Sequence, residues 1–267
     1  MIKQISSIQN PLVKELFQLK EKSRLRKKTG RFLIEGKREI SLALKGNYEV
    51  ETILFDPSII TLESINEMLG PKGFEIVEIT SDVYNKLAHR ATTEGIIAIS
   101  KAKELKLSDI KFLSSSPLIL VAEAPEKPGN IGALLRTADA ANVDAFLIAN
   151  PKTDIYNPNI IRASVGCVFT NTIGMGTTEE IIQFLKMNKV NIYCAAFVDD
   201  AENYCKQDYK EATAIVLGTE AVGLSQKWLE NSRKNIIIPM QGEIDSMNVS
   251  VSAGILIFEA KRQRGFN

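Results

Sequence analysis

The sequence has a single histidine, His89, among its 267 residues. Catalysis by a serine–histidine or cysteine–histidine pair would have to use this one side chain, and a histidine-rich metal site is excluded. His89 lies in the polar stretch KLAHRATTEG, where no catalytic motif surrounds it. We therefore interpret it as a surface side chain outside the catalytic machinery.

Cysteine is also scarce, and its three occurrences are Cys167, Cys194 and Cys205. No two of them have the close spacing of a zinc site, and an odd number is typical of reduced thiols. We expect them to be small hydrophobic residues of the interior. The sequence predicts no metal.

Apolar runs of membrane-spanning length are absent as well. The N-terminal stretch MIKQISSIQNPLVKEL lacks the apolar core of a signal peptide, so the expected location is cytoplasmic, with no membrane partner. Hydrophobic residues make up 45% of the chain and charged residues 24%, as in soluble globular proteins. The length allows one large domain or two ordinary ones.

The formal net charge is only +1, but the basic residues are unevenly placed. Between Lys14 and Arg38 there are ten Lys and Arg residues and three Glu residues. Such a segment attracts a phosphate backbone and is a candidate nucleic-acid contact. A solvated helix face followed by a charged loop explains the same charges equally well.

Strands and helices alternate along the chain, which predicts an α/β protein with two domains, residues 1–105 and 106–267. A helix is expected over residues 10–28, with Leu12, Leu16 and Leu19 on one face. The polar stretch KAKELKLSDIKFLSSS, residues 101–116, is the expected linker. The second domain opens with PLILVAEAP, a continuous apolar strand suited to a parallel sheet. The expected strands cover residues 31–36, 50–56, 74–80, 94–100, 117–125, 145–150, 191–197, 214–220 and 235–240.

Ligands of open α/β sheets bind beyond the carboxyl ends of the strands, and three loops at such positions have unusual chemistry. The first is EKPGNIGALLRTADAANV, residues 126–143, which has neither a dinucleotide nor a Walker signature. Asn130 and Arg136 lie less than two helical turns apart and point to different sides, yet both can approach a substrate lying across the helix start. Alternatively, Asn130 caps the helix and Arg136 forms a surface ion pair.

The second loop is IVLGTEAVGLS, residues 215–225, where Gly218 opens a turn and Glu220 emerges at the end of a strand. Glu220 is a candidate site residue, or it stabilises the N-terminus of the next helix through the helix dipole.

The third loop lies in IIIPMQGEIDSMNVSVSAGILIFEAKRQR, residues 236–264. Ser246 and Asn248 come directly before a helix of small and apolar residues, and the alternative is that both are helix caps. This helix has one face that predicts close packing. That face carries Val249, Ala253, Leu256 and Ala260.

Together and in this order, the three loops resemble the motifs of the SpoU (TrmH-type) family of the SPOUT superfamily of RNA 2′-O-ribose methyltransferases. NIGALLRTADAANV resembles its first motif, IVLGTEAVGLS its second, and IPMQGEIDSMNVSVSAGILIFEA its third. The resemblance covers the whole chain, because FLIEGKREISLAL is similar to the L30e-like substrate-binding domain that precedes the catalytic domain in many members. It implies an L30e-like α/β domain over residues 1–105 and a SPOUT methyltransferase domain over residues 106–267.

The family's catalytic domain has a deep trefoil knot, one of the rare exceptions to unknotted connections. In the family, S-adenosylmethionine binds bent in this knot, between the second and third motif loops, and members work as homodimers. The small-residue face of the last helix is consistent with such a dimer. The resemblance implies that the cofactor is contacted, largely through backbone groups, by Leu217, Gly218, Ile238, Met240 and Met247.

The implied reaction transfers a methyl group from a sulfonium to a ribose 2′-OH, which must be aligned and deprotonated. Arg136 matches the family's catalytic arginine. A guanidinium stays protonated in proteins, so we assign it a phosphate-clamping and orienting role, with a phosphate oxygen aiding deprotonation. Asn130 would position the ribose. The loops and the substrate would be held in register by Glu220, Ser246 and Asn248.

Two residues depart from the family's pattern. Asn142 stands where glycine is common, and asparagine tolerates the left-handed backbone of such a turn. Met247 replaces the usual leucine, which conserves volume. Neither change is expected to remove activity.

The extra N-terminal domain favours ribosomal RNA as substrate, since simpler family members reach tRNA with short extensions. A tRNA methyltransferase and a non-catalytic RNA-binding protein are the alternatives, whereas base-methylating SPOUT enzymes have a different motif pattern. A nicotinamide oxidoreductase is excluded because G-x-G-x-x-G is missing. His89 is interpreted as RNA-facing. The basic candidates for RNA contacts are Lys27, Lys28, Arg31, Lys37, Arg38 and, in NPNIIRASVG, Arg162.

Overall fold

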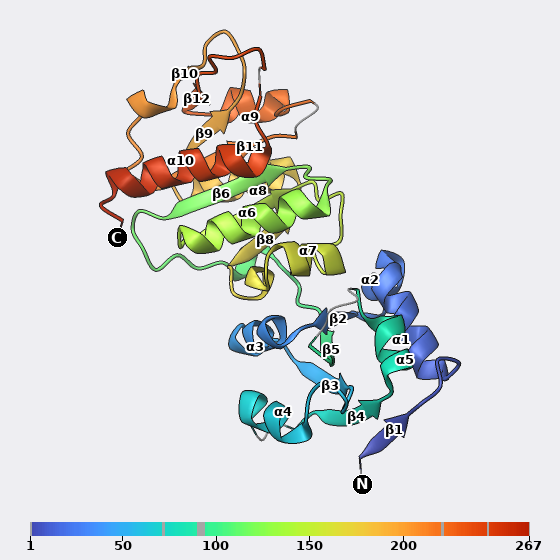
Figure 1. Ribbon diagram of the computed structural model, residues 1–267. Coiled ribbons are helices and arrows are strands. Elements are labelled where there is room, and N and C mark those ends of the chain that lie inside the picture. Colours follow the sequence, from blue (N-terminus) through green and yellow to red (C-terminus); the bar gives the residue numbers. More distant parts are fainter. Residues whose placement is uncertain (1, 71–72, 90–93, 220–221, 245, 267) are drawn as a thin grey trace. The chain divides into compact units, whose positions relative to one another are not determined.

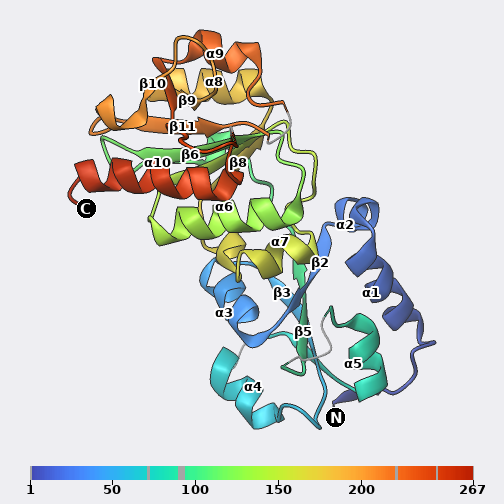
Figure 2. The same ribbon diagram turned by 45° about the horizontal axis from the view of Figure 1, so that its top comes forward.

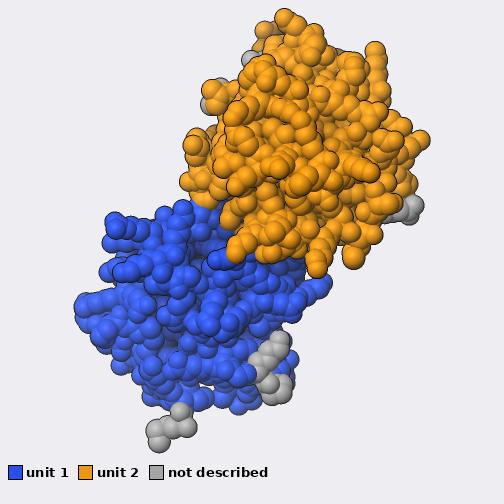
Figure 3. All heavy atoms as spheres, turned by 180° about the vertical axis from the view of Figure 1, so that it is seen from behind, with its two compact units in different colours: residues 1–104, 154–170 blue, residues 105–153, 171–267 orange. Residues whose placement is uncertain are grey.

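The computed structural model describes residues 2–70, 73–89, 94–219, 222–244 and 246–266. The chain forms two compact units, shown in different colours in Figure 3. Unit 1 comprises residues 1–104 and 154–170, and unit 2 comprises residues 105–153 and 171–267. The expected domains were continuous, with a boundary after residue 105. In the structure the first boundary lies one residue earlier, and residues 154–170 belong to unit 1.

Unit 1 is built on a mixed sheet. Its strands are β1 (Lys3–Ile5), β2 (Arg31–Glu35), β3 (Val50–Phe55), β4 (Glu75–Ile79) and β5 (Ile96–Lys101). The strand order is β1-β4-β3-β5-β2 (Figure 1). β4 is parallel to β1 and β3, whereas β5 is antiparallel to β3 and β2. The helices are α1 (Pro11–Glu21), α2 (Ser23–Thr29), α3 (Lys37–Lys45), α4 (Leu62–Leu69), α5 (Ser81–Leu87) and α7 (Pro158–Ala163).

The helix expected over residues 10–28 is in fact two helices, α1 and α2. Lys22 separates them with an extended backbone, φ −111° and ψ 108°. The buried positions of α1 are Val13, Leu16 and Leu19, while Leu12 is only half-buried. The buried face of α1 therefore begins at Val13, one residue later than predicted, and otherwise contains the predicted Leu16 and Leu19.

An ion pair and stacked aromatic rings fix residues 154–170 within unit 1. Arg26 on α2 is buried, and its Nε donates to Asp154 Oδ2 at 2.5 Å. The ring of Tyr156 stacks on Phe32 with centroids 4.3 Å apart, and its hydroxyl lies 3.2 Å from that of Tyr48. Arg26 belongs to the basic segment, so one of the charges predicted to face a nucleic acid is a structural ion pair.

Unit 2 is built on a parallel sheet. Its strands are β6 (Leu118–Glu123), β7 (Ala145–Ala149), β8 (Ile173–Gly176), β9 (Asn191–Ala195), β10 (Glu202–Asn203), β11 (Thr213–Leu217) and β12 (Lys234–Ile237). The order is β10-β12-β9-β11-β6-β7-β8, and each neighbouring pair is parallel. This confirms the predicted α/β class. The helices are α6 (Pro128–Ala140), α8 (Thr178–Met187), α9 (Gln226–Asn231) and α10 (Val249–Gln263).

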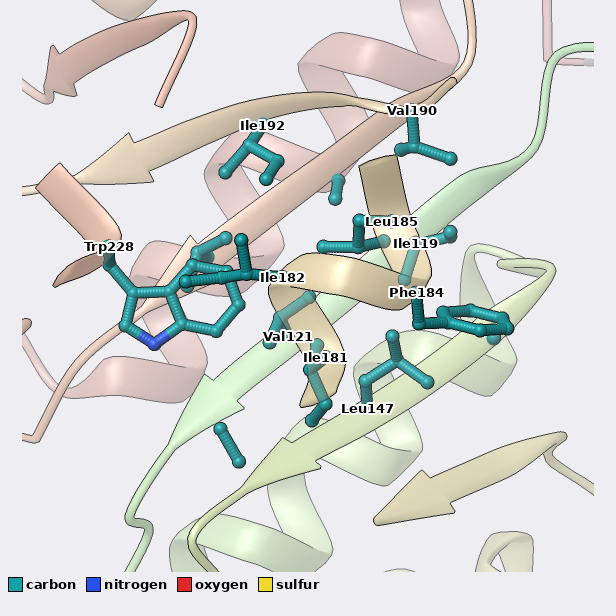
Figure 4. Packing of buried hydrophobic residues seen from close by; sticks show 14 of the residues in the cluster. Ile119, Val121, Leu147, Ile181, Ile182, Phe184, Leu185, Val190, Ile192 and Trp228 are labelled. Atoms are coloured by element: carbon teal, nitrogen blue, oxygen red, sulfur yellow. The ribbon is translucent and has the colours of Figure 1, made fainter. Parts of the chain in front are cut away.

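The helices of unit 2 cover both faces of its sheet. Figure 2 shows α6 and α10 on one face and α8 and α9 on the other. Under α8 and α9 lies an apolar core, in which Trp228 of α9 is fully buried beside Ile182 of α8 (Figure 4). Alternate residues of β6, Ile119 and Val121, point into this core, as expected for a strand with both faces covered.

The expected linker is partly built into unit 2 beside β8. The Met175 amide donates to the Leu105 carbonyl at 2.8 Å. Leu107 and Ile110 pack on the core, and Gly174 makes room for them, since a Cβ there would lie 2.6 Å from the Ile110 side chain. β8 was not expected because glycine weakens strand patterns, and here it marks a close approach.

α10 packs on α6, β6 and β11, and the two helices lie side by side in Figures 1 and 2. Ala253, Leu256 and Ala260 are fully buried by this contact. The close packing predicted for the small-residue face is thus confirmed, but it occurs within the chain. Neither α10 nor any other helix among the described residues is long and apolar enough to cross a membrane.

Candidate active site

The three motif loops follow strands whose carboxyl ends lie at the same edge of the sheet of unit 2. β11 pairs with β6 and with β9, and β12 pairs with β9. The first loop leads into α6, which begins at Pro128 with Lys127 as its N-cap residue. Asn130 is the third residue of the helix, so the alternative that it caps α6 is wrong.

A hydrogen bond joins the first motif to the third. Asn248 is the N-cap of α10, and its Oδ1 accepts from the Ser250 amide at 3.0 Å and from Ser250 Oγ at 2.6 Å. Its Nδ2 donates to Asn130 Oδ1 at 3.2 Å. The capping interpretation is therefore correct for Asn248, and the same side chain also holds Asn130. Ser246 is exposed two residues earlier.

Arg136 is exposed on α6, less than two turns beyond Asn130. It forms no ion pair with any residue that the structure describes, so the alternative of a surface ion pair finds no support there. α6 ends at Ala140, and Asn142 has a φ of 47°. The left-handed turn expected at this departure from the family's glycine is confirmed.

Two residues of the second motif, Thr219 and Gly223, pair through their backbones directly after β11. The Thr219 amide donates to the Gly223 carbonyl at 3.2 Å, and the Gly223 amide donates back to the Thr219 carbonyl at 3.0 Å. Gly218 has no space for a side chain, because a Cβ would lie 2.2 Å from the Gly223 carbonyl carbon. Glu220, the predicted carboxylate of this loop, lies outside the described residues.

The other residues predicted to contact the cofactor differ in which of their atoms a ligand can reach. Leu217 is buried at the end of β11, so its backbone is the part within reach. Ile238 and Met240 follow β12 and are half-buried, as is Met247. Among the described residues, no group of His, Cys, Asp or Glu side chains is arranged to hold a metal ion.

Sequence reasoning missed Glu123, the last residue of β6, which is only 6% exposed. Its Oε2 accepts from the Ser225 amide at 2.7 Å, and its Oε1 accepts from Ser225 Oγ at 2.7 Å and from Thr178 Oγ1 at 2.8 Å. Glu123 also lines a cleft together with Asn130 and Gly218. The available signal was a charged residue ending an otherwise apolar strand, PLILVAEAP.

The predicted RNA contacts all lie in unit 1. Lys27 and Lys28 are exposed on α2. Arg31 is half-buried and pairs with Glu51 at 2.6 Å and Glu15 at 3.7 Å, so its charge is already compensated. Its side chain is therefore a weaker candidate than its neighbours.

A pocket of about 330 Å³ in unit 1 brings Arg38 and Arg162 together, although 123 residues separate them in the chain. His89 also lines it, with Nε2 2.9 Å from Asn159 Oδ1. The pocket has carboxylates too, and burial raises the pKa of one of them, Glu39. Its apolar lining is formed by Leu33, Leu87, Ile97, Pro158 and Ile161.

Lys37 begins α3 and is half-buried. Its backbone amide donates to Glu94 Oε2 at 2.5 Å. The side chain of Lys37 is not part of the pocket lining, in contrast to that of Arg38 next to it.

Residues 117–258, which contain all three motif loops, match the model of the SpoU rRNA methylase family. The chain belongs to this family. Residues 10–98 match the model of the MRM3-like substrate binding domain. The resemblance inferred from the motifs is thereby confirmed.

Relatives and solved structures of this family match the chain almost end to end. The 23S rRNA (guanosine(2553)-2′-O)-methyltransferase RlmP of Bacillus subtilis is 28% identical over 97% of this chain and 100% of its own. A crystal structure of an RNA 2′-O ribose methyltransferase is 37% identical, with a TM-score of 0.84 over 98% of this chain and 99% of the other. An AdoMet-bound rRNA methyltransferase from Sinorhizobium meliloti is 26% identical, with a TM-score of 0.88 over 98% of both chains.

Proposed function

We propose that this SpoU protein transfers a methyl group from S-adenosylmethionine to a ribose 2′-OH of ribosomal RNA. The observation that carries the proposal is the contact between Asn130 and Asn248, which joins the first and third motifs beside the loop of the second. The relatives support the substrate, because the Bacillus subtilis protein is named for 2′-O-methylation of 23S rRNA.

The second and third motif loops fit a cofactor bound largely through backbone groups. Gly218 lies against the Gly223 backbone with no side chain between, and it is half-buried in the lining of the cleft at the end of β11. Ile238, Met240 and Met247 are accessible apolar side chains that can cover the flat apolar parts of a nucleoside. S-adenosylmethionine would supply an electrophilic methyl group there.

The chain's own contribution is positioning. An in-line displacement requires the hydroxyl oxygen to be held in line with the methyl carbon and to lose its proton. Asn130, fixed by Asn248, would orient the ribose through its amide. Arg136 is exposed on the same helix and would hold an RNA phosphate, with which a guanidinium forms paired hydrogen bonds.

Unit 1 would bind the RNA outside the reacting nucleotide. Arg38 and Arg162 share one pocket there, and Lys27 and Lys28 are exposed on α2. Phosphate contacts from such residues fix position and orientation without reading sequence. This assigns substrate binding to residues 1–105 with residues 154–170, and catalysis to the rest of residues 106–267, in the cytoplasm where ribosomal RNA is found.

We infer a homodimer as the working form. The small-residue face of α10 is already covered within the chain, so another surface must form the dimer interface. Val251 and Phe258 lie seven residues apart on α10, are 49% and 40% exposed, and share one face. The deep knot of the SPOUT catalytic domain remains a prediction that the strand order of unit 2 allows.

The proposal is tested by incubating the protein with methyl-labelled S-adenosylmethionine and unmodified 23S rRNA or tRNA. We expect label on a ribose of 23S rRNA, and a loss of at least about 100-fold in Arg136→Ala. The matched control is Arg233→Ala, which removes an exposed arginine at the opposite, amino end of β12.

Label on a base would contradict the reaction, and label on tRNA alone would contradict the substrate. Cofactor binding without label on RNA or on ribosomal particles would identify a non-catalytic RNA-binding protein instead.

A further inference from the structure

Glu123 is a buried carboxylate that has no cation as partner among the residues that the structure describes. Its hydrogen-bond donors are an amide and two hydroxyl groups, and it forms no ion pair with any residue in the described part of unit 2. Burying an unpaired charge is costly even when it is hydrogen-bonded, and an apolar residue at the end of an apolar strand would avoid that cost. The presence of a carboxylate at this position is therefore not explained by the stability of the fold.

The donors show what Glu123 holds. Ser225 is the N-cap residue of α9, yet its hydroxyl does not cap the helix and instead donates to Glu123. Its amide donates to the same carboxylate. Ser225 ends the second motif loop, which begins at Gly218 directly after β11. The loop is thus fastened at one end by the sheet and at the other by Glu123.

The register of the sheet explains why Glu123 can reach this loop. Ala122 of β6 lies opposite Leu217 of β11, so Glu123 stands one residue further, level with the start of the loop. A carboxylate has two oxygens that can accept several hydrogen bonds at once, which a serine or an amide side chain at this position could not match.

Thr178 of α8 also holds the Glu123 carboxylate. Thr178, the first residue of α8, donates to Glu123 through Oγ1 and accepts from Asn150 Nδ2 at 2.9 Å. The Thr178 amide donates to Asn150 Oδ1 at 3.3 Å. The chain Asn150–Thr178–Glu123–Ser225 therefore connects the carboxyl ends of β7, β6 and the loop after β11.

We propose that Glu123 is a positioning residue that holds the second motif loop in its cofactor-binding form by anchoring Ser225. The inference rests on the proposed function for the identity of the cofactor. Its direct consequence concerns the free protein: Ser225 is held in place before any ligand binds, so the cofactor does not have to position this end of the loop.

The test compares the full-length protein with Glu123→Gln and Ser225→Ala. Glutamine keeps the shape but turns one acceptor into a donor, so one of the three bonds to Glu123 must be lost or reversed. We expect Glu123→Gln to weaken S-adenosylmethionine binding at least about tenfold by calorimetry, with kcat at saturating cofactor and the KM for RNA within about twofold. Ser225→Ala keeps the amide bond and should show a smaller effect in the same direction.

The control is Glu230→Gln, which removes an exposed carboxylate from α9 itself and should change nothing measured here. Glu123→Gln combined with Ser225→Ala should lose less affinity than the two single losses added together, because both changes act on the contact between Glu123 and Ser225. A folded Glu123→Gln protein with unchanged cofactor affinity would overturn the inference. Additive losses would overturn it as well.

Hydrogen exchange gives a readout that needs no cofactor. The Ser225 amide should exchange at least about tenfold faster in Glu123→Gln, while the amides of β6 and β11 keep their protection. Faster exchange throughout unit 2 would indicate a merely structural role. If the wild-type protein binds no S-adenosylmethionine, the proposed function fails, and the exchange of the Ser225 amide still decides whether Glu123 anchors the loop. Should Glu123→Gln fail to fold, Ser225→Ala carries the same comparison.

Discussion

Asn248 Nδ2 donates to Asn130 Oδ1 across 118 residues of sequence, and this bond fixes the starts of α10 and α6 against each other. The same Asn248 side chain caps α10 through its Oδ1. One amide therefore performs two separable tasks, helix capping with the oxygen and placement of Asn130 with the nitrogen.

The two tasks can be separated by substitution. Asn248→Ser keeps a capping oxygen but is too short to reach Asn130, whereas Asn248→Ala loses both functions. We expect both variants to lose methyl transfer by about tenfold, as for one hydrogen bond of about 1.4 kcal/mol. Only Asn248→Ala should also lose about 1 kcal/mol of unfolding free energy, measured by urea denaturation.

A double-mutant cycle completes this prediction. Asn130→Ala combined with Asn248→Ser should be no slower than the slower single variant, because the bond is removed once. If the rate loss of the double variant equals the product of the two single losses, Asn130 and Asn248 act separately.

Gly218 is the position where the second motif tolerates no side chain. In Gly218→Ala the new Cβ would lie 2.2 Å from the Gly223 carbonyl carbon, so residues 218 and 223 must move apart. We expect the Kd for S-adenosylmethionine to rise at least about tenfold, measured by calorimetry. The matched control is Gly73→Ala in unit 1, where a Cβ meets nothing within 4 Å. That change should leave the Kd for S-adenosylmethionine unchanged. Unchanged cofactor affinity in Gly218→Ala would show that the close approach of Gly218 to Gly223 does not matter for cofactor binding.

The position of Asn130, Gly218 and Asn248 beyond the carboxyl ends of parallel strands was predictable, whereas their roles stay predictions. Glu123 escaped notice because its role depends on Thr178 and Ser225, which only the folded sheet brings within hydrogen-bonding distance. Long-range partners of this kind leave no local pattern in a sequence.

Contacts between residues far apart in the chain also limited the prediction of the fold. The long parallel strands were expected from their apolar runs, whereas β8 was hidden by Gly174 and Gly176, whose missing side chains serve the packing of Leu107 and Ile110. The assignment of residues 154–170 to unit 1 rests on Tyr156 against Phe32, a contact between residues far apart in the chain.

The basic segment should divide into RNA contacts and one structural residue. Changing Lys27 and Lys28 to Ala should weaken rRNA binding and reduce the slope of log Kd against log salt by about 1 to 2, because two phosphate contacts are lost. Unfolding free energy should stay within about 0.5 kcal/mol, since both side chains are exposed. An unchanged salt slope, from filter binding at several salt concentrations, would remove α2 from the RNA-binding surface.

Arg26→Ala is the counterpart within the same helix. It leaves Asp154 buried without its cation, and such a loss costs about 3–5 kcal/mol of unfolding free energy. Arg31 is intermediate, because its pairs with Glu51 and Glu15 are partly solvent-exposed. Arg31→Ala should change the salt slope less than either lysine substitution. An equal change would show that Arg31 leaves its carboxylate partners and contacts the RNA.

The three free thiols should differ sharply in reactivity. Cys194 is fully buried, its thiol donates to the Trp228 carbonyl at 3.4 Å, and burial raises its pKa to about 12. Since the thiolate is the reactive form, Cys194 remains protonated at pH 8 and its reaction in the folded chain requires opening of α9. Cys167 is buried in unit 1, whereas Cys205 is exposed.

We therefore expect a disulfide reagent at pH 8 to modify one thiol per folded chain and three in denaturant, and none in folded Cys205→Ser. Because the raised pKa disfavours the thiolate, moving from pH 8 to pH 9 should leave Cys194 unmodified. Peptide mapping assigns the modified residue. Labelling of Cys194 in the folded protein would mean that α9, and with it the Ser225 anchor at its start, opens on the time scale of the reaction. Glu123 would then hold Ser225 only part of the time.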